Sequence, residues 1–223
     1  MGGRSGVIGA TGYRREFLAI PPPTRNGEGA VLLCDPLTGL IGYPSFQECL
    51  TAELPALAPV GLHLAIGDVD DLKRFVTERR ADDPTMFGHL AGNDCMQRLG
   101  AATLEWSETE LADWEFALCG TFGGDEVVVA ACGGPYEEFV RTIADLADRV
   151  KRAAPRSCSF AVGTARATIR AEDAPYAYRN LVASVDAALF ERKEAMRRAG
   201  IDPAGELVDV ATIELERPPA VGR

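Results

Sequence analysis

Two apolar runs of strand length lie close together near the middle of the chain, and they constrain its fold more than any other feature. Residues 114–120 (WEFALCG) and 126–132 (EVVVAAC) are separated only by 121–125 (TFGGD), which contains two glycines. Glycines in a short connection between runs of strand-forming residues are typical of a hairpin. The sequence therefore predicts an antiparallel pair of strands here.

Helical and strand-like segments alternate on both sides of this predicted hairpin. Apolar spacing and residue propensity predict helices at 44–54, 88–106, 136–152 and 176–198, and strands at 60–68, 158–166 and 207–215. Helices that alternate with strands around one hairpin are typical of an α/β sandwich. The expected architecture is a central sheet built on a ferredoxin-like split βαβ core.

The patterned part of the chain is expected to form one domain. Residues 1–30 are rich in Gly, Arg and Pro and show no period, which predicts a flexible N-terminal arm. The pattern covers 31–215, and 216–223 is expected to be a C-terminal tail. A chain of 223 residues can bury a sizeable core without disulfides or metals.

Charge and cysteine content argue against several classes of protein. The formal net charge is −10 and no basic stripe is present, so a nucleic acid polymer is not an expected partner. A nucleotide remains compatible if a local basic cluster and divalent cations hold its phosphates. The six cysteines form no CxxC pair, which argues against zinc, and free thiols without a signal peptide favour the cytoplasm. No apolar run is long enough to span a membrane.

Carboxylates gather at the end of the apolar run at 60–68. Asp68, Asp70 and Asp71 lie where a buried strand would open to solvent, a rigid position from which to hold a hard cation. The alternative interpretation is that Asp68 or Asp70 caps a helix that starts at Leu72.

A second acidic cluster lies on the predicted hairpin turn. Gly123 and Gly124 would let the backbone approach a phosphate closely, and Asp125 and Glu126 add further carboxylates. The alternative is a solvated hairpin tip. If the two acidic strands are neighbours in one sheet, Asp68 and Asp125 could bind the same magnesium ions together with substrate phosphates.

A basic pair lies on the last predicted long helix. Lys193 and Arg197 are four residues apart and share one face, where they could grip phosphates. The alternative is a solvated basic face to which Arg192 and Arg198 also belong.

Five motifs in order along the chain resemble those of GGDEF domains, the diguanylate cyclases. They are DPLTGL at 35–40, GDVDDLK at 67–73, GHLAGND at 88–94, GGDEV at 123–127 and VDAALFERKEAMR at 185–197. The resemblance covers about 170 residues, and five signatures in order are far more specific than one. It implies a cyclase that joins nucleoside triphosphates, with GTP as the expected substrate and c-di-GMP as the expected product.

The resemblance also implies a role for each matching residue. Two Mg²⁺ or Mn²⁺ ions per site would be held by Asp68, the Val69 carbonyl and Asp125, and Glu126 would be the second acid of the catalytic loop. The residues that match the family's phosphate-binding positions are Lys73, Gly123, Gly124, Lys193 and Arg197. In the family two GTP-loaded domains face each other, so a homodimer is expected at least transiently.

The chain departs from the family where guanine is read. Val76 stands where the family has an Asn, and Asn93 stands where it has an Asp. The segment from Lys73 to Gly88 is longer than in the family, and we expect Asn93 and a residue of 76–86 to line the base pocket. An amide donates as well as accepts, so a base other than guanine stays open. The RxxD of the family's product-inhibition site is replaced by WEFA at 114–117.

Two other functions stay open from the sequence. One is a catalytically silent GGDEF-like module that binds a nucleotide and acts through a partner. The other is a related enzyme that makes a linear or mononucleotide product. Retention of Asp68, Asp125 and Glu126 argues against the silent module.

Overall fold

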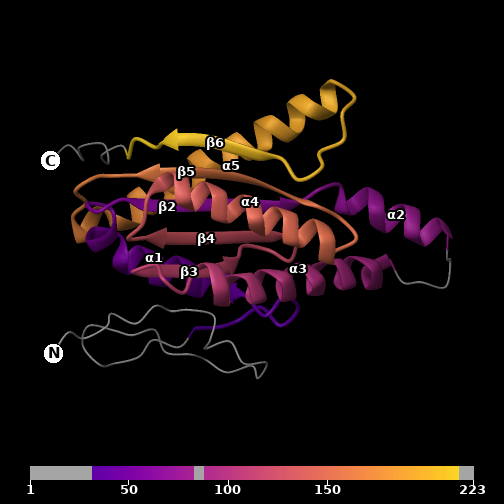
Figure 1. Ribbon diagram of the computed structural model, residues 1–223, viewed down its shortest axis with the longest axis horizontal. Coiled ribbons are helices and arrows are strands. Elements are labelled where there is room, and N and C mark those ends of the chain that lie inside the picture. Colours follow the sequence, from indigo (N-terminus) through magenta and orange to yellow (C-terminus); the bar gives the residue numbers. More distant parts are fainter. Residues whose placement is uncertain (1–31, 83–87, 216–223) are drawn as a thin grey trace, which may run out of the picture.

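The computed structural model describes residues 32–82 and 88–215, and its core is a six-stranded sheet in the order β1-β3-β4-β2-β5-β6 (Figure 1). The strands are β1 (Ile41–Gly42), β2 (Leu62–Val69), β3 (Phe116–Thr121), β4 (Glu126–Cys132), β5 (Cys158–Ala165) and β6 (Leu207–Thr212). The arm expected at 1–30 and the tail expected at 216–223 lie outside the described residues, as does part of the long segment after Lys73.

The predicted hairpin and the split βαβ core are confirmed. β3 and β4 are antiparallel and pair from Phe116↔Cys132 to Gly120↔Val128. β2 is antiparallel to both β4 and β5 and lies between them. β4 therefore separates β2 from β3, and β2 separates β4 from β5, which is the split arrangement of a ferredoxin-like core.

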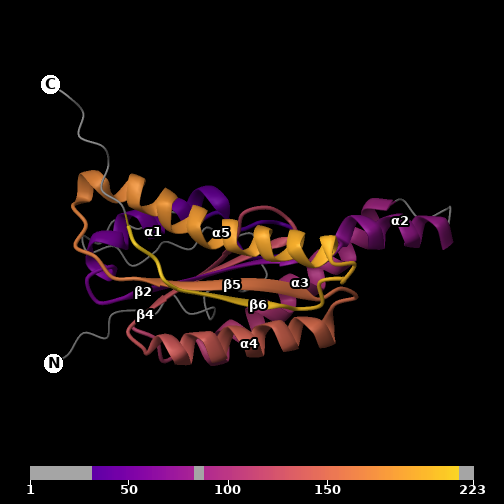
Figure 2. The same cartoon turned by 90° about the horizontal axis from the view of Figure 1, so that it is seen from above.

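Helices cover both faces of the sheet, so that the molecule has three layers (Figure 2). α1 and α5 lie on one face, and α3 and α4 lie on the other. The helices are α1 (Tyr43–Leu57), α2 (Leu72–Asp82), α3 (Gly88–Glu110), α4 (Tyr136–Ala153) and α5 (Ala174–Arg198). Among the described residues, no helix combines the length and apolar character needed to cross a bilayer.

The sequence pattern explains this layering. In α4 the buried residues Phe139, Ile143, Leu146 and Val150 recur every three or four positions, which makes one apolar stripe. β4 is buried on both faces, because Val127 and its alternate neighbours pack toward α3 and α4 while the residues between them pack toward α1 and α5. A strand covered on both sides reads as a continuous apolar run rather than an alternating one.

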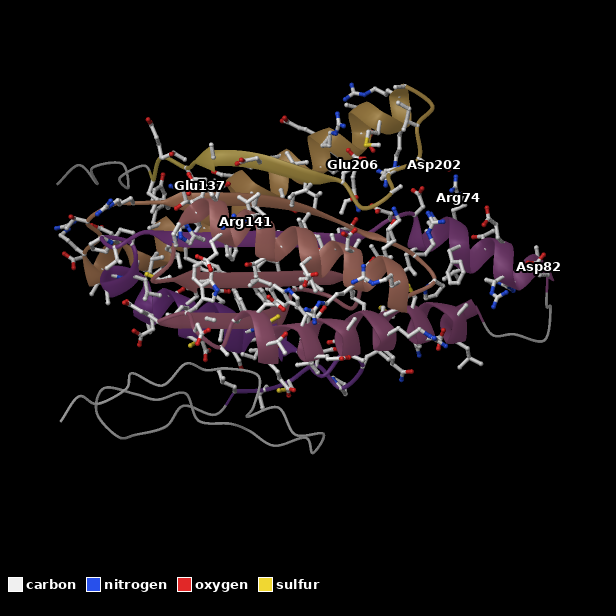
Figure 3. All side chains as sticks on the ribbon, viewed as in Figure 1. Arg74, Asp82, Glu137, Arg141, Asp202 and Glu206 are labelled. Carbon is white, nitrogen blue, oxygen red and sulfur yellow. The ribbon has the colours of Figure 1, made fainter. Side chains whose placement is uncertain are left out.

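α2 was not among the helices predicted from apolar spacing, although the alternative interpretation of the acidic segment placed the start of a helix at Leu72. It has no buried residue and projects beyond the end of the sheet (Figure 1). Leu72 and Phe75 are partly buried and pack against the part of the core that α3 covers, which fixes the first turns of α2. Arg74 then makes a two-pronged contact with Asp202, on the connection between α5 and β6, at 2.8 and 3.0 Å (Figure 3).

Candidate active site

The two acidic segments meet at one edge of the sheet. Asp68 lies at the end of β2 directly opposite Glu126 at the start of β4. The N–H of Val69 donates to the carbonyl oxygen of Asp125 at 3.0 Å, which ties the end of β2 to the hairpin turn. The antiparallel pairing of β2 and β4 therefore brings together groups that are more than fifty residues apart in the chain.

Close backbone packing fixes both segments. A Cβ at Gly67 would lie 2.3 Å from the ring of Phe160 in β5, so only glycine lets β2 run this close to that ring just before Asp68. In the turn, the Glu126 N–H donates to the Gly123 carbonyl at 2.9 Å. A Cβ at Gly124 would lie 2.5 Å from the sulfur of Met96 on α3, whereas Gly123 is exposed and its Cβ would have room.

Lys193 reaches the site from α5 and is buried. Its side chain is only 4 % exposed, and its ammonium forms an ion pair with the Asp68 carboxylate and a second one with Asp70 at 3.0 Å. It also donates to the backbone carbonyl of Asp68 at 2.8 Å. Lys193 is therefore not part of a solvated basic face, unlike Arg192, which is half exposed and pairs with Glu206.

Asp70 is a fully buried carboxylate, which corrects the expectation that it opens to solvent with Asp68 and Asp71. It accepts hydrogen bonds from Ser157 Oγ at 2.9 Å, Ser159 Oγ at 2.8 Å and the N–H of Gly205 at 2.8 Å. These contacts show that its side chain is directed into the fold and does not serve as the helix cap considered from the sequence. A signal was available, because two serines flank Cys158 at the start of an otherwise apolar strand.

Asp71 gathers guanidinium groups from three different elements. Its carboxylate lies 3.6 Å from Arg197, 3.6 Å from Arg156 and 3.7 Å from Arg74. Asp71 has a positive φ of 51°, which turns the chain sharply between β2 and α2. Arg74, which directly follows Lys73, and Arg156 are further basic groups here that the motifs did not include, and Arg156 comes close to the site only in the folded chain.

An open cleft of about 600 Å³ lies at this edge of the sheet, a size that suits a small-molecule ligand. Four of the predicted site residues that carry side-chain chemistry line it: Asp68, Lys73, Asp125 and Arg197. The other lining residues are Val69, Asp71, Leu72, Arg74 and Thr77. Acidic and basic groups thus share one opening, as binding of a metal-complexed polyphosphate requires.

The predicted base-reading residues lie elsewhere. Val76 packs against α3, where its Cγ2 would be 3.4 Å from a Cβ placed on Gly92. Asn93 follows Gly92 and is half-buried. Among the described residues that line the cleft, neither Val76 nor Asn93 appears, and Thr77 is the side chain of α2 farthest along the chain. The structure therefore places Val76 at the α2–α3 contact and Asn93 on α3, and neither residue lines the cleft.

Burial and neighbouring charges raise the pKa of two carboxyl groups at the site, Glu126 and Asp68. Burial, with the charges of Asp125 and Asp68 next, raises the pKa of Glu126 to about 7. Burial also raises the pKa of Asp68, and the Lys193 ammonium in contact with it opposes that shift. Carboxylates crowded in this way bind a cation more favourably than isolated ones, because the cation relieves their mutual repulsion.

The donor set fits a hard divalent cation that is completed by substrate. In the described ranges, no three His, Cys, Asp or Glu side chains converge tightly enough to make a preformed metal cluster. Asp68 and Asp125 do face one cleft, and Val69, whose carbonyl oxygen is a further donor, lines it too. Magnesium commonly uses one or two carboxylates and takes its remaining ligands from water and phosphate. The ammonium of Lys193 already pairs with Asp68, which shows that this carboxylate attracts a cation.

Comparison with known proteins identifies the fold. No family model matches the chain, and no curated protein matches its sequence. Among solved structures, the diguanylate cyclase SiaD of Pseudomonas aeruginosa, solved with its activator SiaC, superposes with a TM-score of 0.59 at 23 % identity over 79 % of this chain. The match spans 61 % of the SiaD chain, less than two thirds of its length.

Two further GGDEF structures match over more of their own length. A microbial GGDEF domain that interacts with cyclic di-GMP gives a TM-score of 0.55 at 22 % identity, with 79 % of this chain and 95 % of that one covered. The coiled coil and GGDEF domain of DgcB from Caulobacter crescentus, in complex with c-di-GMP, gives 0.57 at 15 % identity, covering 79 % and 85 %. The described part of the chain therefore has the fold of GGDEF domains.

Proposed function

We propose that this protein is a metal-dependent nucleotidyl cyclase that condenses two nucleoside triphosphates into a cyclic dinucleotide and releases pyrophosphate. GTP is the proposed substrate and c-di-GMP the proposed product. The observation that carries the proposal is the shared cleft, where Asp68 and Asp125 lie with Lys73 and Arg197. This combination of oxygen ligands and cations suits a triphosphate bound with Mg²⁺ or Mn²⁺.

Two divalent ions per site would be held by Asp68, the Val69 carbonyl and Asp125. When bound, they would neutralise the charge that builds up on the transferring phosphoryl group. Lys73 is exposed and Arg197 is 43 % exposed, so both side chains reach solvent in the cleft, where they can contact phosphate oxygens. Gly123 lies exposed at the tip of the turn, where its N–H group can approach the α-phosphate.

Glu126 is the residue proposed to assist loss of the proton from the attacking 3′-hydroxyl. Its raised pKa, about 7, lets it hold or release a proton near neutral pH. One copy of the domain presents one cleft, so closure of a ring between two nucleotides requires two copies facing each other. A transient homodimer is therefore part of the proposal, and its six free cysteines suit a reducing cytoplasm.

The second candidate function is a nucleotide-binding module without turnover. The observation that favours it is that, in the described residues, the carboxylates do not form a preformed metal cluster. In such a module the cleft would bind a triphosphate or a cyclic dinucleotide, but no pyrophosphate would be released.

The test is incubation of the purified chain with each of the four nucleoside triphosphates and Mg²⁺ or Mn²⁺, with products identified by mass spectrometry. We expect a cyclic dinucleotide and pyrophosphate from the wild type, and loss of both in Asp68→Asn and Asp125→Asn. Asp82→Asn is the matched control, because Asp82 is exposed at the far end of α2, away from the cleft (Figure 3).

Each alternative has its own result. Binding of a triphosphate without any product would establish the silent module. A linear or mononucleotide product would establish the related enzyme. Undiminished product from Asp68→Asn and Asp125→Asn would show that the chemistry lies elsewhere in the molecule.

A further inference from the structure

Lys193 has two carboxylate partners that differ in how firmly they are fixed. Its ammonium contacts Asp68, whose side chain is 34 % exposed and lines the cleft. It also contacts Asp70, whose side chain is 0 % exposed, at 3.0 Å. A buried ammonium is strongly destabilising unless it is paired, so the position of Lys193 depends on these two acids.

Asp70 cannot exchange its partners easily. Both of its carboxylate oxygens accept a hydrogen bond from Ser159, one also from Ser157, and the N–H of Gly205 donates to it from the connection between α5 and β6. Its own carbonyl accepts from Arg156 at 2.8 Å. Hydrogen bonds from the body of the fold therefore hold Asp70, whereas Asp68 faces solvent and can take another cation.

We propose that Lys193 is an internal counter-ion that occupies Asp68 while the cleft is empty, and that Asp70 is the positioning residue that holds it there. A divalent cation and the Lys193 ammonium then compete for the same carboxylate. Phosphate oxygens of a bound triphosphate offer Lys193 a new partner, so nucleotide binding frees Asp68 for the metal. Lys193 thereby couples metal binding to nucleotide binding and keeps metal affinity low in the nucleotide-free protein.

The inference rests on the proposed function only in taking Asp68 as a metal ligand. It adds Lys193 as a competitor of the metal for Asp68, and it gives the buried Asp70 a role. The expected phosphate contact of Lys193 can form only after its ammonium leaves the Asp68 carboxylate, with which it pairs in the nucleotide-free state.

The experiment measures Mn²⁺ binding to the nucleotide-free full-length chain by electron paramagnetic resonance of the free ion. Lys193→Met removes the competing charge at nearly constant length, and we expect Mn²⁺ to bind on the order of tenfold more tightly. Arg192→Met is the matched control, because it removes one positive charge from the same helix, while Arg192 pairs with Glu206 and is not among the residues that line the cleft. It should change the affinity less than about threefold.

A double-mutant cycle tests the role of Asp70. In Asp70→Asn, Lys193 loses the buried charged partner that holds it beside Asp68, so it competes less well for that carboxylate and Mn²⁺ binding should tighten. In the Lys193→Met background the same change at Asp70 should have no effect on Mn²⁺ affinity, because the competitor is already gone. The double variant also removes both buried charges together, so it stays folded even if Lys193→Met alone unfolds. A melting curve for each variant establishes that it is folded.

The outcomes separate this inference from the proposed function. Equal Mn²⁺ affinity in wild type, Lys193→Met and the double variant, with binding abolished by Asp68→Asn, would overturn the counter-ion role and leave the metal ligand intact. An effect of Asp70→Asn that persists without Lys193 would reduce Asp70 to a structural residue. Unchanged Mn²⁺ binding in Asp68→Asn would instead refute the metal site of the proposed function.

Discussion

Gly67→Ala perturbs the fold at the position that sets the direction of Asp68. The added methyl group would lie 2.3, 2.6 and 2.8 Å from three carbons of the Phe160 ring. Ordinary contacts between carbon atoms are about 3.5–4.0 Å, so the ring or β2 has to move by more than ~1 Å. Phe160 is fully buried in the core beneath α3 and α4 and has little room to move.

The size of the effect follows from two opposing contributions. Overpacking of a well-packed core costs about 1–3 kcal/mol. Replacing glycine by alanine in a compatible backbone returns about 0.4–1 kcal/mol, because the unfolded chain loses conformational freedom. We therefore expect a net loss of roughly 1–2 kcal/mol in the free energy of unfolding, which for a domain of this size lowers Tm by about 2–8 °C.

Urea unfolding of the wild type, Gly67→Ala and Gly123→Ala measures this effect. Gly123→Ala is the matched control, because the nearest atom to its Cβ is the Glu126 carboxylate oxygen at an ordinary 3.6 Å. The control should keep wild-type stability within about 0.5 kcal/mol. If Gly67→Ala were as stable as the control, the close approach of β2 to Phe160 would not be what constrains this strand.

Four further predictions concern binding, pH and specificity. Arg197→Met should raise the KM for the triphosphate more than it lowers kcat, as steady-state kinetics would show, because its guanidinium lies in the cleft beside Asp68. Burial lowers the pKa of His63, so its contribution to stability is complete above the unfolded pKa of about 6.5 and is lost as pH falls below it. The free energy of unfolding of His63→Gln should therefore depend less on pH between about 7 and 5, as urea unfolding at each pH would reveal. Asn93→Asp should shift selectivity toward GTP by about 1–3 kcal/mol if the amide reads the base, as competition between triphosphates would measure. Added c-di-GMP should not inhibit tightly and non-competitively, since 114–117 lacks the arginine and aspartate of the family's inhibition site.

Much of the fold was predictable because it depends on local patterns. The runs that became β2, β4 and β5 are predominantly apolar and almost continuously buried, as expected of strands covered on both faces. The alternation of elements then placed β2 beside β4, and this contact brings Asp68 opposite Glu126. α2 was considered only as an alternative, through a cap before Leu72, because a helix without a buried face shows no apolar stripe.

The environment of Lys193 was not predictable from spacing. Four residues separate it from Arg197 and place both on one face of α5, yet Lys193 is buried and Arg197 is 43 % exposed. The difference arises from Asp70, which lies more than a hundred residues earlier in the chain and pairs with Lys193 at 3.0 Å. Helical periodicity reports which side chains are neighbours on a helix, but the tertiary fold decides which of them finds a buried partner.

Base recognition is expected to depend on how α2 and α3 pack, a tertiary contact that motif spacing does not reveal. A motif offset assigned Val76 and Asn93 to the base pocket, and the structure places Val76 against Gly92, the residue before Asn93 on α3. The cleft that holds the acids, however, is lined from α2 by Leu72, Lys73, Arg74 and Thr77. A base that reaches Asn93 must therefore extend past Thr77 toward α3. Because α2 has no buried residue and the Arg74–Asp202 contact holds it near its start, a small tilt of this helix would change which base edge Asn93 meets. Base selectivity in this protein is thus expected to depend on the position of α2 as much as on the identity of residue 93.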